Sequence, residues 1–186
     1  MRWLFPLKLN YRGITNDLNS FFGFEWKKEI EIPVGDHVGA FGVTRRHDVH
    51  KGVDLYADKG EPVYVVEDGN IVHIRQFTGE ALGTGWWNDT WAVSVEGKSG
   101  VIVYGEIIPV ANIKDIDSIL AGDLIGYVDQ VLKKNKGRPQ SMLHFSLHNH
   151  GVLSNGEWRI GEGCPVGLLD PTNDLIRSDK EWWKKF

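Results

Sequence analysis

The stretch HKGVDLYADKGEPVYVVEDG, residues 50–69, places a histidine and an aspartate four positions apart, just ahead of an apolar, β-branched run. Four residues of a straight strand span about 13 Å, whereas two ligands of one metal ion each lie about 2 Å from it. His50 and Asp54 can therefore share a cation only if the chain bends between them, and Gly52 supplies the conformational freedom for a bend. A surface histidine followed by a turn aspartate is the alternative, so the pair alone leaves the question open until a third ligand is found.

Short apolar runs interrupted by Gly, Asp and Asn surround this stretch. Residues 29–34, EIEIPV, alternate like a half-buried strand, and the runs 61–66 and 69–77 are separated by a turn typical of a hairpin. A second hairpin is predicted between WAVSVEG and GVIVYGEI, followed by the strands GDLIGYV and SMLHFSLH. This spacing indicates a mostly β chain, an antiparallel sandwich or barrel.

The ends of the chain differ from this central part. Residues 1–28 are aromatic and irregular, and we expect them to form a lead-in that packs on a main domain of residues 29–171. The tail, residues 172–186, follows an Asp-Pro turn and is predicted to be helical, and residues 111–120 can form one short helix.

The composition is that of an ordinary globular protein, with 41% hydrophobic and 25% charged residues. The net charge of −4 comes without a long run of one sign, which argues against nucleic acid or an anionic membrane as the main partner. The basic pairs Arg45-Arg46 and Lys133-Lys134 are typical of a solvated surface. Cys164 is the only cysteine, which excludes an internal disulfide and a cysteine metal cluster.

Neither a secretion signal nor a membrane span is visible. The apolar run at the start, MRWLFPLKLNYRG, is broken by Pro6 and Lys8, and no stretch approaches the roughly 20 apolar residues of a span. The direct expectation is a cytoplasmic protein, although a processed or unconventional export route stays open. Nothing in the sequence indicates the oligomeric state.

A third candidate ligand is His144, in the apolar run SMLHFSLH. An isolated histidine on a strand is more often a hydrogen-bonded core residue than a ligand. His148 shares its face but lies about 13 Å away along a regular strand, too far for the same ion. His37 and His73 are isolated and have no predicted role.

The order of the motifs makes the ligand interpretation stronger. Phe41-Gly42 with a nearby arginine, then HKGVDLYADKGEPVYVVEDGNIV, VYGEI, GDLIGYV and MLHF resemble the lysostaphin-type, LytM-like zinc metallopeptidases that act on peptidoglycan. That family reads HxGxD, AxxGTPVxAxxxGxV, YAHL, GxxIGxxG and HxHFE. The resemblance covers about residues 29–171, and it implies an antiparallel sandwich–barrel hybrid with one zinc ion in an open groove.

By motif, the resemblance implies that His50, Asp54 and His144 bind the zinc. Three protein ligands leave one position for an activated water, which is the arrangement of a hydrolytic zinc site. The implied substrate is peptidoglycan or another peptide.

The sequence departs from the family at two positions. Glu106 replaces the histidine of YAHL, and Met142 replaces the first histidine of HxH, both of which act on the water or the oxyanion in the family. Methionine can neither transfer a proton nor donate a hydrogen bond, so Met142 is expected only to fill space. Glu106 can be a general base, as in other zinc hydrolases, or a surface residue, or an additional metal contact.

Five further residues are candidates for lining the substrate groove. Arg46, His47 and Arg138 precede two of the ligand motifs, and Arg138 can donate to an oxyanion or a substrate carboxylate; exposed loop charges are the alternative. Trp86 and Trp87 lie in a Gly-flanked loop, where they can stack on a sugar or a peptide or be buried against the lead-in.

Three functions are compatible with these residues. The first is a zinc-dependent metallopeptidase that acts on peptidoglycan peptides, with Glu106 as base, and it is favoured because all three ligands are present. The second is a zinc-holding binding or regulatory module of the same fold that has lost catalysis. The third is a domain like the phosphocarriers of sugar permeases, in which the HxxxD pair has no role. The first function would place the protein in the periplasm or outside the cell, although no secretion signal is visible in the sequence.

Overall fold

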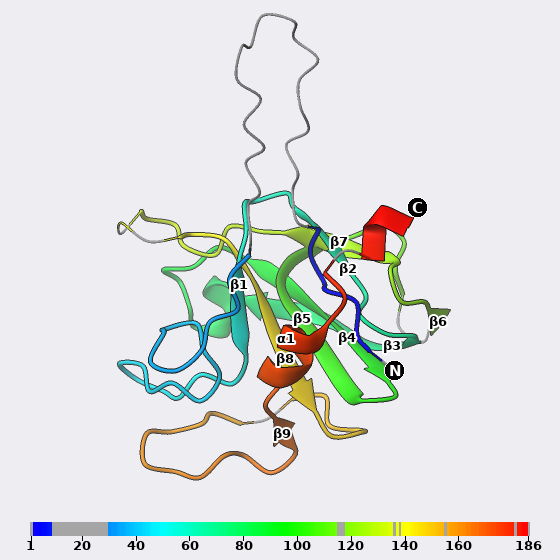
Figure 1. Ribbon diagram of the computed structural model, residues 1–186. Coiled ribbons are helices and arrows are strands. Elements are labelled where there is room, and N and C mark those ends of the chain that lie inside the picture. Colours follow the sequence, from blue (N-terminus) through cyan, green and yellow to red (C-terminus); the bar gives the residue numbers. More distant parts are fainter. Residues whose placement is uncertain are drawn as a thin grey trace, which may run out of the picture.

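The computed structural model describes residues 2–8, 30–114, 118–135, 137, 139–154, 156–180 and 182–185. Within these residues one antiparallel sheet of nine strands accounts for most of the regular structure (Figure 1). The strands are β1 (Val53–Tyr56), β2 (Pro62–Tyr64), β3 (Gly69–Thr78), β4 (Thr90–Gly97), β5 (Gly100–Pro109), β6 (Ser118–Ile119), β7 (Leu124–Val128), β8 (Met142–His148) and β9 (Leu168–Leu169). The helices are η1 (Glu80–Leu82), α1 (Thr172–Arg177) and η2 (Trp182–Lys185).

The main path through the sheet runs in the order β1-β8-β5-β4-β3-β6. β7 joins this path through β5 and also pairs with β2, while β9 pairs with β8. The predicted mostly β, antiparallel fold is confirmed, as are the β4–β5 hairpin, with Gly97 opposite Gly100, and the helical tail.

β5 changes its partner in the middle of the strand. Residues 101–105 pair with β8, whereas residues 107–109 pair with β7. Glu106 lies between the two halves with a φ of 64° and has no partner on β4, where Ala92 pairs with Gly105 and Trp91 pairs with Ile107. The strand therefore turns a corner at a β-bulge, a feature that often occurs next to functional sites.

Two local predictions are wrong. The runs 61–66 and 69–77 do not form a hairpin, because β2 pairs with β7 and β3 pairs with β4 and β6. The turn between them is held by Glu67, whose buried carboxylate accepts hydrogen bonds from the indole of Trp3 and from the backbone and hydroxyl of Ser99. This contact fixes the turn against the β4–β5 hairpin and directs the two runs to different partners.

The strand predicted at 29–34 is also absent from its described part, residues 30–34, which is irregular and contains Pro33, a residue without a backbone donor. The helix considered for 111–120 does not occur in the described residues of that segment. Residues 111 and 112 form a turn, and Ser118–Ile119 form β6.

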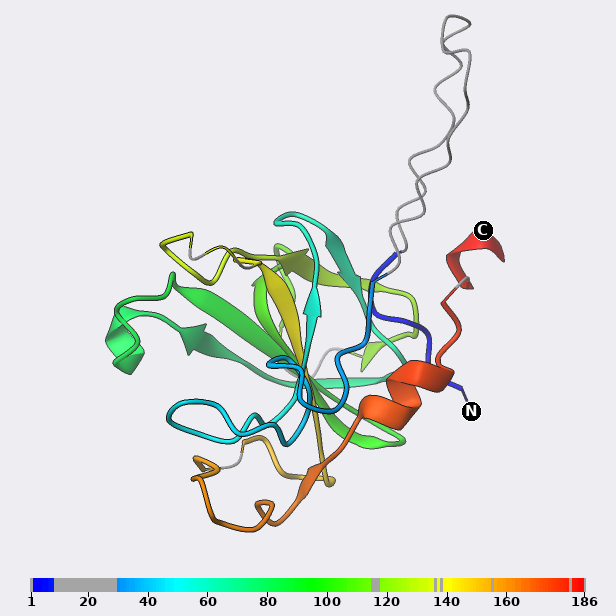
Figure 2. The ribbon, with the colours of Figure 1, turned by 60° about the vertical axis from the view of Figure 1, so that its left-hand side comes forward.

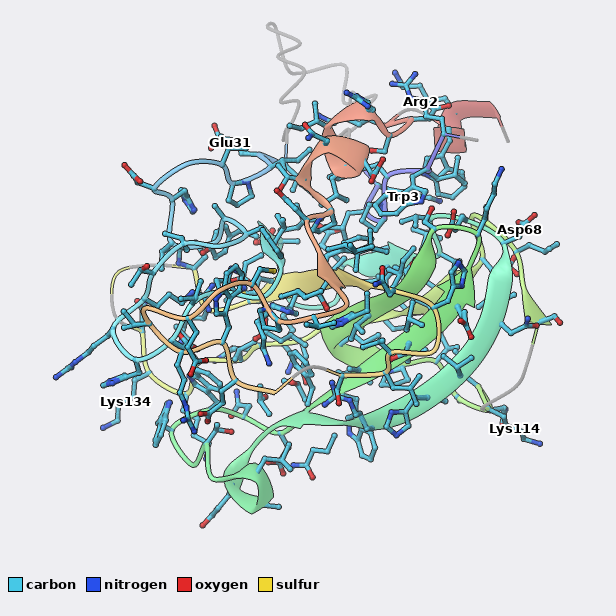
Figure 3. The ribbon with its side chains drawn as sticks, turned by 90° about the horizontal axis from the view of Figure 1, so that it is seen from below. Arg2, Trp3, Glu31, Asp68, Lys114 and Lys134 are labelled. Atoms are coloured by element: carbon cyan, nitrogen blue, oxygen red, sulfur yellow. The ribbon has the colours of Figure 1, made fainter. Side chains whose placement is uncertain are left out.

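The described part of the predicted lead-in, residues 2–8, packs against the sheet and the C-terminal segment; residues 9–28 lie outside the described residues. The side chains of Trp3, Phe5 and Leu7 are all buried. Leu7 forms a bridge with Val63, and the Phe5 backbone N–H donates to Asp179. Figure 3 shows Arg2 and Trp3 beside the C-terminal helices. The division into lead-in, main domain and tail remains a prediction.

The two faces of the sheet have different compositions. On one face the buried side chains include Leu55, Tyr104 and Phe145, and the rings of Tyr104 and Phe145 meet edge to face with centroids 5.4 Å apart. Since successive strand residues point to opposite faces, Asp54 and His144, the neighbours of these core residues, lie on the other face. The candidate site therefore lies on the face of the sheet opposite these core side chains.

Candidate metal centre

His50, Asp54 and His144 come together at the junction of β1 and β8, where Asp54 lies directly opposite His144. His50 Nε2 is 3.1 Å from Asp54 Oδ1 and 3.2 Å from His144 Nδ1, and His144 Nδ1 is 2.9 Å from Asp54 Oδ1. One ligand atom from each residue thus occupies a corner of a nearly equilateral triangle.

This triangle fits a tetrahedral zinc ion. Bonds of about 2.0–2.1 Å at tetrahedral angles separate neighbouring ligand atoms by about 3.3 Å, close to the three edges found here. The donor set of two imidazoles and one carboxylate is also typical of zinc. His50 and Asp54 are buried and His144 is partly buried. Three protein ligands would leave one of the four positions of a tetrahedral ion for a further ligand.

The second ring nitrogen of His50 fixes its tautomer. His50 Nδ1 lies 2.9 Å from the carbonyl oxygen of Ala40 and donates to it. The lone pair of Nε2 is therefore free to point at Asp54 and His144, the usual arrangement for a metal-binding histidine.

The protonation states of the other two residues also favour a cation. Burial lowers the pKa of His144 to about 4, which outweighs the opposing hydrogen bond and charge of Asp54. Burial alone would raise the pKa of Asp54, but its contacts with the imidazoles of His144 and His50 lower it below its usual value. At neutral pH Asp54 is then a carboxylate and His144 a neutral imidazole, the forms that bind metals.

Gly52 has a different function from the predicted one. The chain does bend at Gly52, but the residue has no positive φ. A Cβ at this position would lie 2.7 Å from His144 Nε2 and 2.7 Å from the carbonyl oxygen of Phe145. The glycine is needed for the close approach of β8, not for an unusual backbone conformation.

Arg45 is a site residue that the sequence analysis missed, since Arg45-Arg46 was interpreted as solvated surface. Its guanidinium donates to Asp54 Oδ2 and, through Nε, to the Val38 carbonyl oxygen at 3.0 Å. Asp54 is thereby held by Oδ2, while its Oδ1 faces the two histidines. The only sequence signal was the arginine that follows Phe41-Gly42.

Glu106 is buried, with 8% of its surface exposed, so it is not a surface residue. It does not belong to the group of metal-ligand atoms that lie within 4.8 Å of one another. Its Oε2 is buried and has no hydrogen-bond partner among the described residues. Burial raises the pKa of Glu106 well above its usual value, the charge of Asp54 raises it further, and Arg45 opposes the shift. Glu106 is thus close enough to Asp54 and Arg45 to feel their charges.

Two more residues define the surroundings. Met142 is buried at the start of β8, opposite Tyr56, in agreement with a space-filling function. The Phe77 ring, which the sequence analysis did not single out, packs on the His144 imidazole with centroids 5.2 Å apart. Gly105 leaves room for this ring, since a Cβ there would lie 2.8 Å from Phe77 Cε1.

The remaining predicted residues lie on loops. The loop before β1 and those joining β3 to β4, β7 to β8 and β8 to β9 extend on the side of the sheet away from α1 (Figure 2). Arg46 and His47 are exposed in the first of these loops. Trp86 is 63% exposed, so it is not buried against the lead-in, and it meets Trp87 edge to face with centroids 6.1 Å apart. Arg138 lies outside the described residues.

A depression of about 390 Å³ lies elsewhere on the described surface, along β3, β6 and β7. Its lining includes Ile71, Ile113, Ile119 and Leu124 and contains no residue of the His50, Asp54 and His144 cluster. Separately, no helix in the described part of the chain has the length and apolar character needed to cross a membrane.

Comparison with known families agrees with this geometry. Residues 48–156 match the model of peptidase family M23, a family of metallopeptidases, and the chain belongs to this family. The matched segment contains Glu106 and Met142 as well as the cluster of His50, Asp54 and His144. No curated protein sequence matches the chain.

One solved structure has the same fold, and two others are also similar to this chain. The catalytic domain of the antimicrobial peptidase lysostaphin from Staphylococcus simulans is 19% identical, with 79% of this chain and 92% of that chain covered and a TM-score of 0.51. The structure of cbpa from L. salivarius REN is 20% identical, with 74% of this chain and 86% of that chain covered and a TM-score of 0.48. A mutant catalytic domain of the prophage-encoded M23 protein EnpA from Enterococcus faecalis is 17% identical, with 74% of this chain and 96% of that chain covered and a TM-score of 0.48.

Proposed function

We propose that this protein is a zinc-dependent metalloendopeptidase that cleaves peptide bonds of peptidoglycan, with His50, Asp54 and His144 as zinc ligands and Glu106 as general base. The observation that carries this proposal is a complete three-ligand triangle with a buried, unpartnered carboxyl group nearby. The substrate class follows from the M23 family and from the fold shared with lysostaphin, an antimicrobial peptidase. Such a substrate places the protein's site of action in the periplasm or outside the cell.

Held by His50, Asp54 and His144, a zinc ion would lower the pKa of a bound water and polarise the scissile carbonyl group. The residues of the chain do the remaining work. The backbone acceptor at Ala40 and the guanidinium of Arg45 hold His50 and Asp54 in their binding orientations. Glu106 accepts a proton from the attacking water and passes it to the leaving amine, as a carboxylate base does in other zinc hydrolases.

The unpartnered buried oxygen and the left-handed backbone of Glu106 support the catalytic interpretation. A buried polar atom without a partner costs about 1–3 kcal/mol, and a non-glycine residue in a left-handed conformation costs a similar amount. Both costs fall on the residue that replaces a family histidine, and a packing residue would avoid them. A cation and a water beside Glu106 would provide the missing charge and hydrogen bond.

A second function, a zinc-holding binding module without catalysis, is favoured by one observation. Met142 occupies the position of the other family histidine and is packed into the structure, so the site lacks that second proton donor. The two functions share the metal and differ only in turnover.

Elemental analysis of protein purified without added metal, combined with release of peptides from purified peptidoglycan, tests the proposal. We expect one zinc per chain, turnover that stops on chelation, and loss of the metal in His144→Ala. In Glu106→Gln we expect the zinc to stay and turnover to stop. Zinc without turnover in the wild type would establish the binding module, and a wild type without metal would refute both.

A further inference from the structure

A row of residues crosses the sheet from the candidate metal centre to an arginine on β3. Asp54 lies opposite His144, which in turn lies opposite Gly105. Gly105 lies opposite Ala92, which lies opposite Arg75. Directly opposed residues of antiparallel strands share one face, so Arg75 is on the same face of the sheet as the cluster. The two residues between them, Gly105 and Ala92, have no bulky side chain.

From this arrangement we propose that Arg75 forms a subsite for a carboxylate of the peptide substrate. This proposal rests on the peptidase function proposed above and specifies the substrate: a peptide with a free acidic group two or three residues from the cleaved bond.

The distance between the Arg75 guanidinium and His144 is limited by two ring contacts. The guanidinium carbon of Arg75 is 5.3 Å from the centre of the Phe77 ring, and that ring is 5.2 Å from the centre of the His144 imidazole. The guanidinium therefore lies no farther from His144 than these two distances together. An extended peptide advances about 3.3 Å per residue, so a bond cleaved at the metal leaves the second or third neighbouring residue at Arg75.

No carboxylate of the described residues neutralises the charge of Arg75. Among the described residues Arg75 forms no ion pair, and its Nε is buried without a hydrogen-bond partner. Buried donors without acceptors are rare in folded proteins, so the Nε of Arg75 indicates that an acceptor from outside the chain completes its hydrogen bonding.

A carboxylate fits better than other anions of similar charge. The planar fork of an arginine matches the two oxygens of a carboxylate, and a half-buried guanidinium strengthens such a bond. A carboxylate and its amide have nearly the same shape but differ in charge. The subsite would distinguish these two forms.

The test uses two cross-linked stem-peptide dimers that differ only in having a free or an amidated α-carboxyl group at the second residue. Calorimetry on the zinc-loaded Glu106→Gln variant measures their binding, and the wild type measures their cleavage. We expect the free acid to bind roughly tenfold more tightly than the amide, the usual gain from one charge-assisted hydrogen bond.

Adding Arg75→Gln should reduce this preference to less than about twofold and leave the affinity for the amide unchanged. Arg177→Gln, an exposed arginine on α1, is the matched control and should keep the full preference. Zinc content and thermal unfolding verify that each variant is folded. Equal binding of acid and amide, a preference that survives Arg75→Gln, or no binding of either peptide would overturn the subsite. Failure of the wild type to cleave either peptide would instead refute the peptidase function.

Discussion

Arg45 donates to Oδ2 of Asp54, and this contact leaves Oδ1 as the oxygen that faces His50 and His144. A carboxylate can bind a metal through either oxygen, so the arginine selects the one that completes the ligand triangle. The guanidinium also lies close enough to Glu106 to oppose the rise of its pKa. One side chain thus acts on both the candidate ligand and the candidate base.

Replacing this arginine should weaken metal binding. In Arg45→Gln we expect the zinc affinity to fall by 10- to 100-fold, the usual effect of removing a residue that orients a ligand. Competition with a chromophoric chelator measures the affinity. Arg46→Gln, at the exposed neighbouring position, is the control and should bind zinc like the wild type; an unchanged affinity in Arg45→Gln would contradict the orienting function.

Replacing the candidate base should separate binding from turnover. In Glu106→Gln we expect stoichiometric zinc and a fall in turnover of at least about 100-fold, because an amide cannot accept the proton of the water. Peptide release measured side by side with elemental analysis provides the comparison. Turnover equal to that of the wild type would show that Glu106 is not the base.

The same carboxyl group should make the stability of the metal-free protein depend on pH. Its pKa is higher in the folded protein than the ordinary value of 4.5. The protonated Glu106 carboxyl group therefore makes its full contribution to stability below pH 4.5. This contribution is lost as the pH rises through the raised pKa of the folded protein. With chelator present, Glu106→Gln should unfold like the wild type near pH 4 and be more stable than it at pH 8.

Urea unfolding at a series of pH values measures this difference. Asp54 and His144 titrate in both proteins, and their folded pKa values are lowered, so they contribute stability that is lost on the acid side. Subtracting the two profiles isolates Glu106. Parallel profiles from pH 4 to pH 8 would show that the carboxyl group is not destabilised by ionisation.

Adding one methyl group at Gly52 should disrupt the cluster. In Gly52→Ala the new Cβ would meet both a ring nitrogen of His144 and a backbone oxygen at 2.7 Å, and the backbone oxygen cannot move without shifting β8. We expect a loss of about 1–3 kcal/mol in unfolding free energy, together with weaker zinc binding. Gly163→Ala, where nothing lies within 4 Å of the added Cβ, is the matched control and should leave both measurements unchanged.

Local patterns were sufficient for much of the fold. The β4–β5 hairpin was predictable because its two strands are adjacent in the sequence and its turn contains Gly97 and Gly100. The β2–β3 hairpin was predicted from signals of the same quality and is wrong. The partner of β2 lies some 60 residues away in β7, and the contact that separates β2 from β3 is made by the buried Glu67.

The candidate site shows the same division. His50, Asp54 and His144 were identifiable because their spacing and order are carried by the sequence itself. Arg45 was missed, since its neighbour Arg46 has the same charge and only the three-dimensional turn decides which of them reaches Asp54. Phe77 and Arg75 were missed because their relation to His144 depends on the register of four strands.

At the corner in β5, one residue provides both the backbone bulge and the functional group, and these two contributions can be varied separately. Glu106 holds the left-handed bulge that sends the strand from β8 to β7, and the backbone pairing on either side defines this corner. Inserting or deleting a residue would therefore shift every pair beyond the corner, whereas exchanging the side chain alone leaves the number of residues between the pairs unchanged. Engineering at this place should vary the functional group and leave the chain length alone.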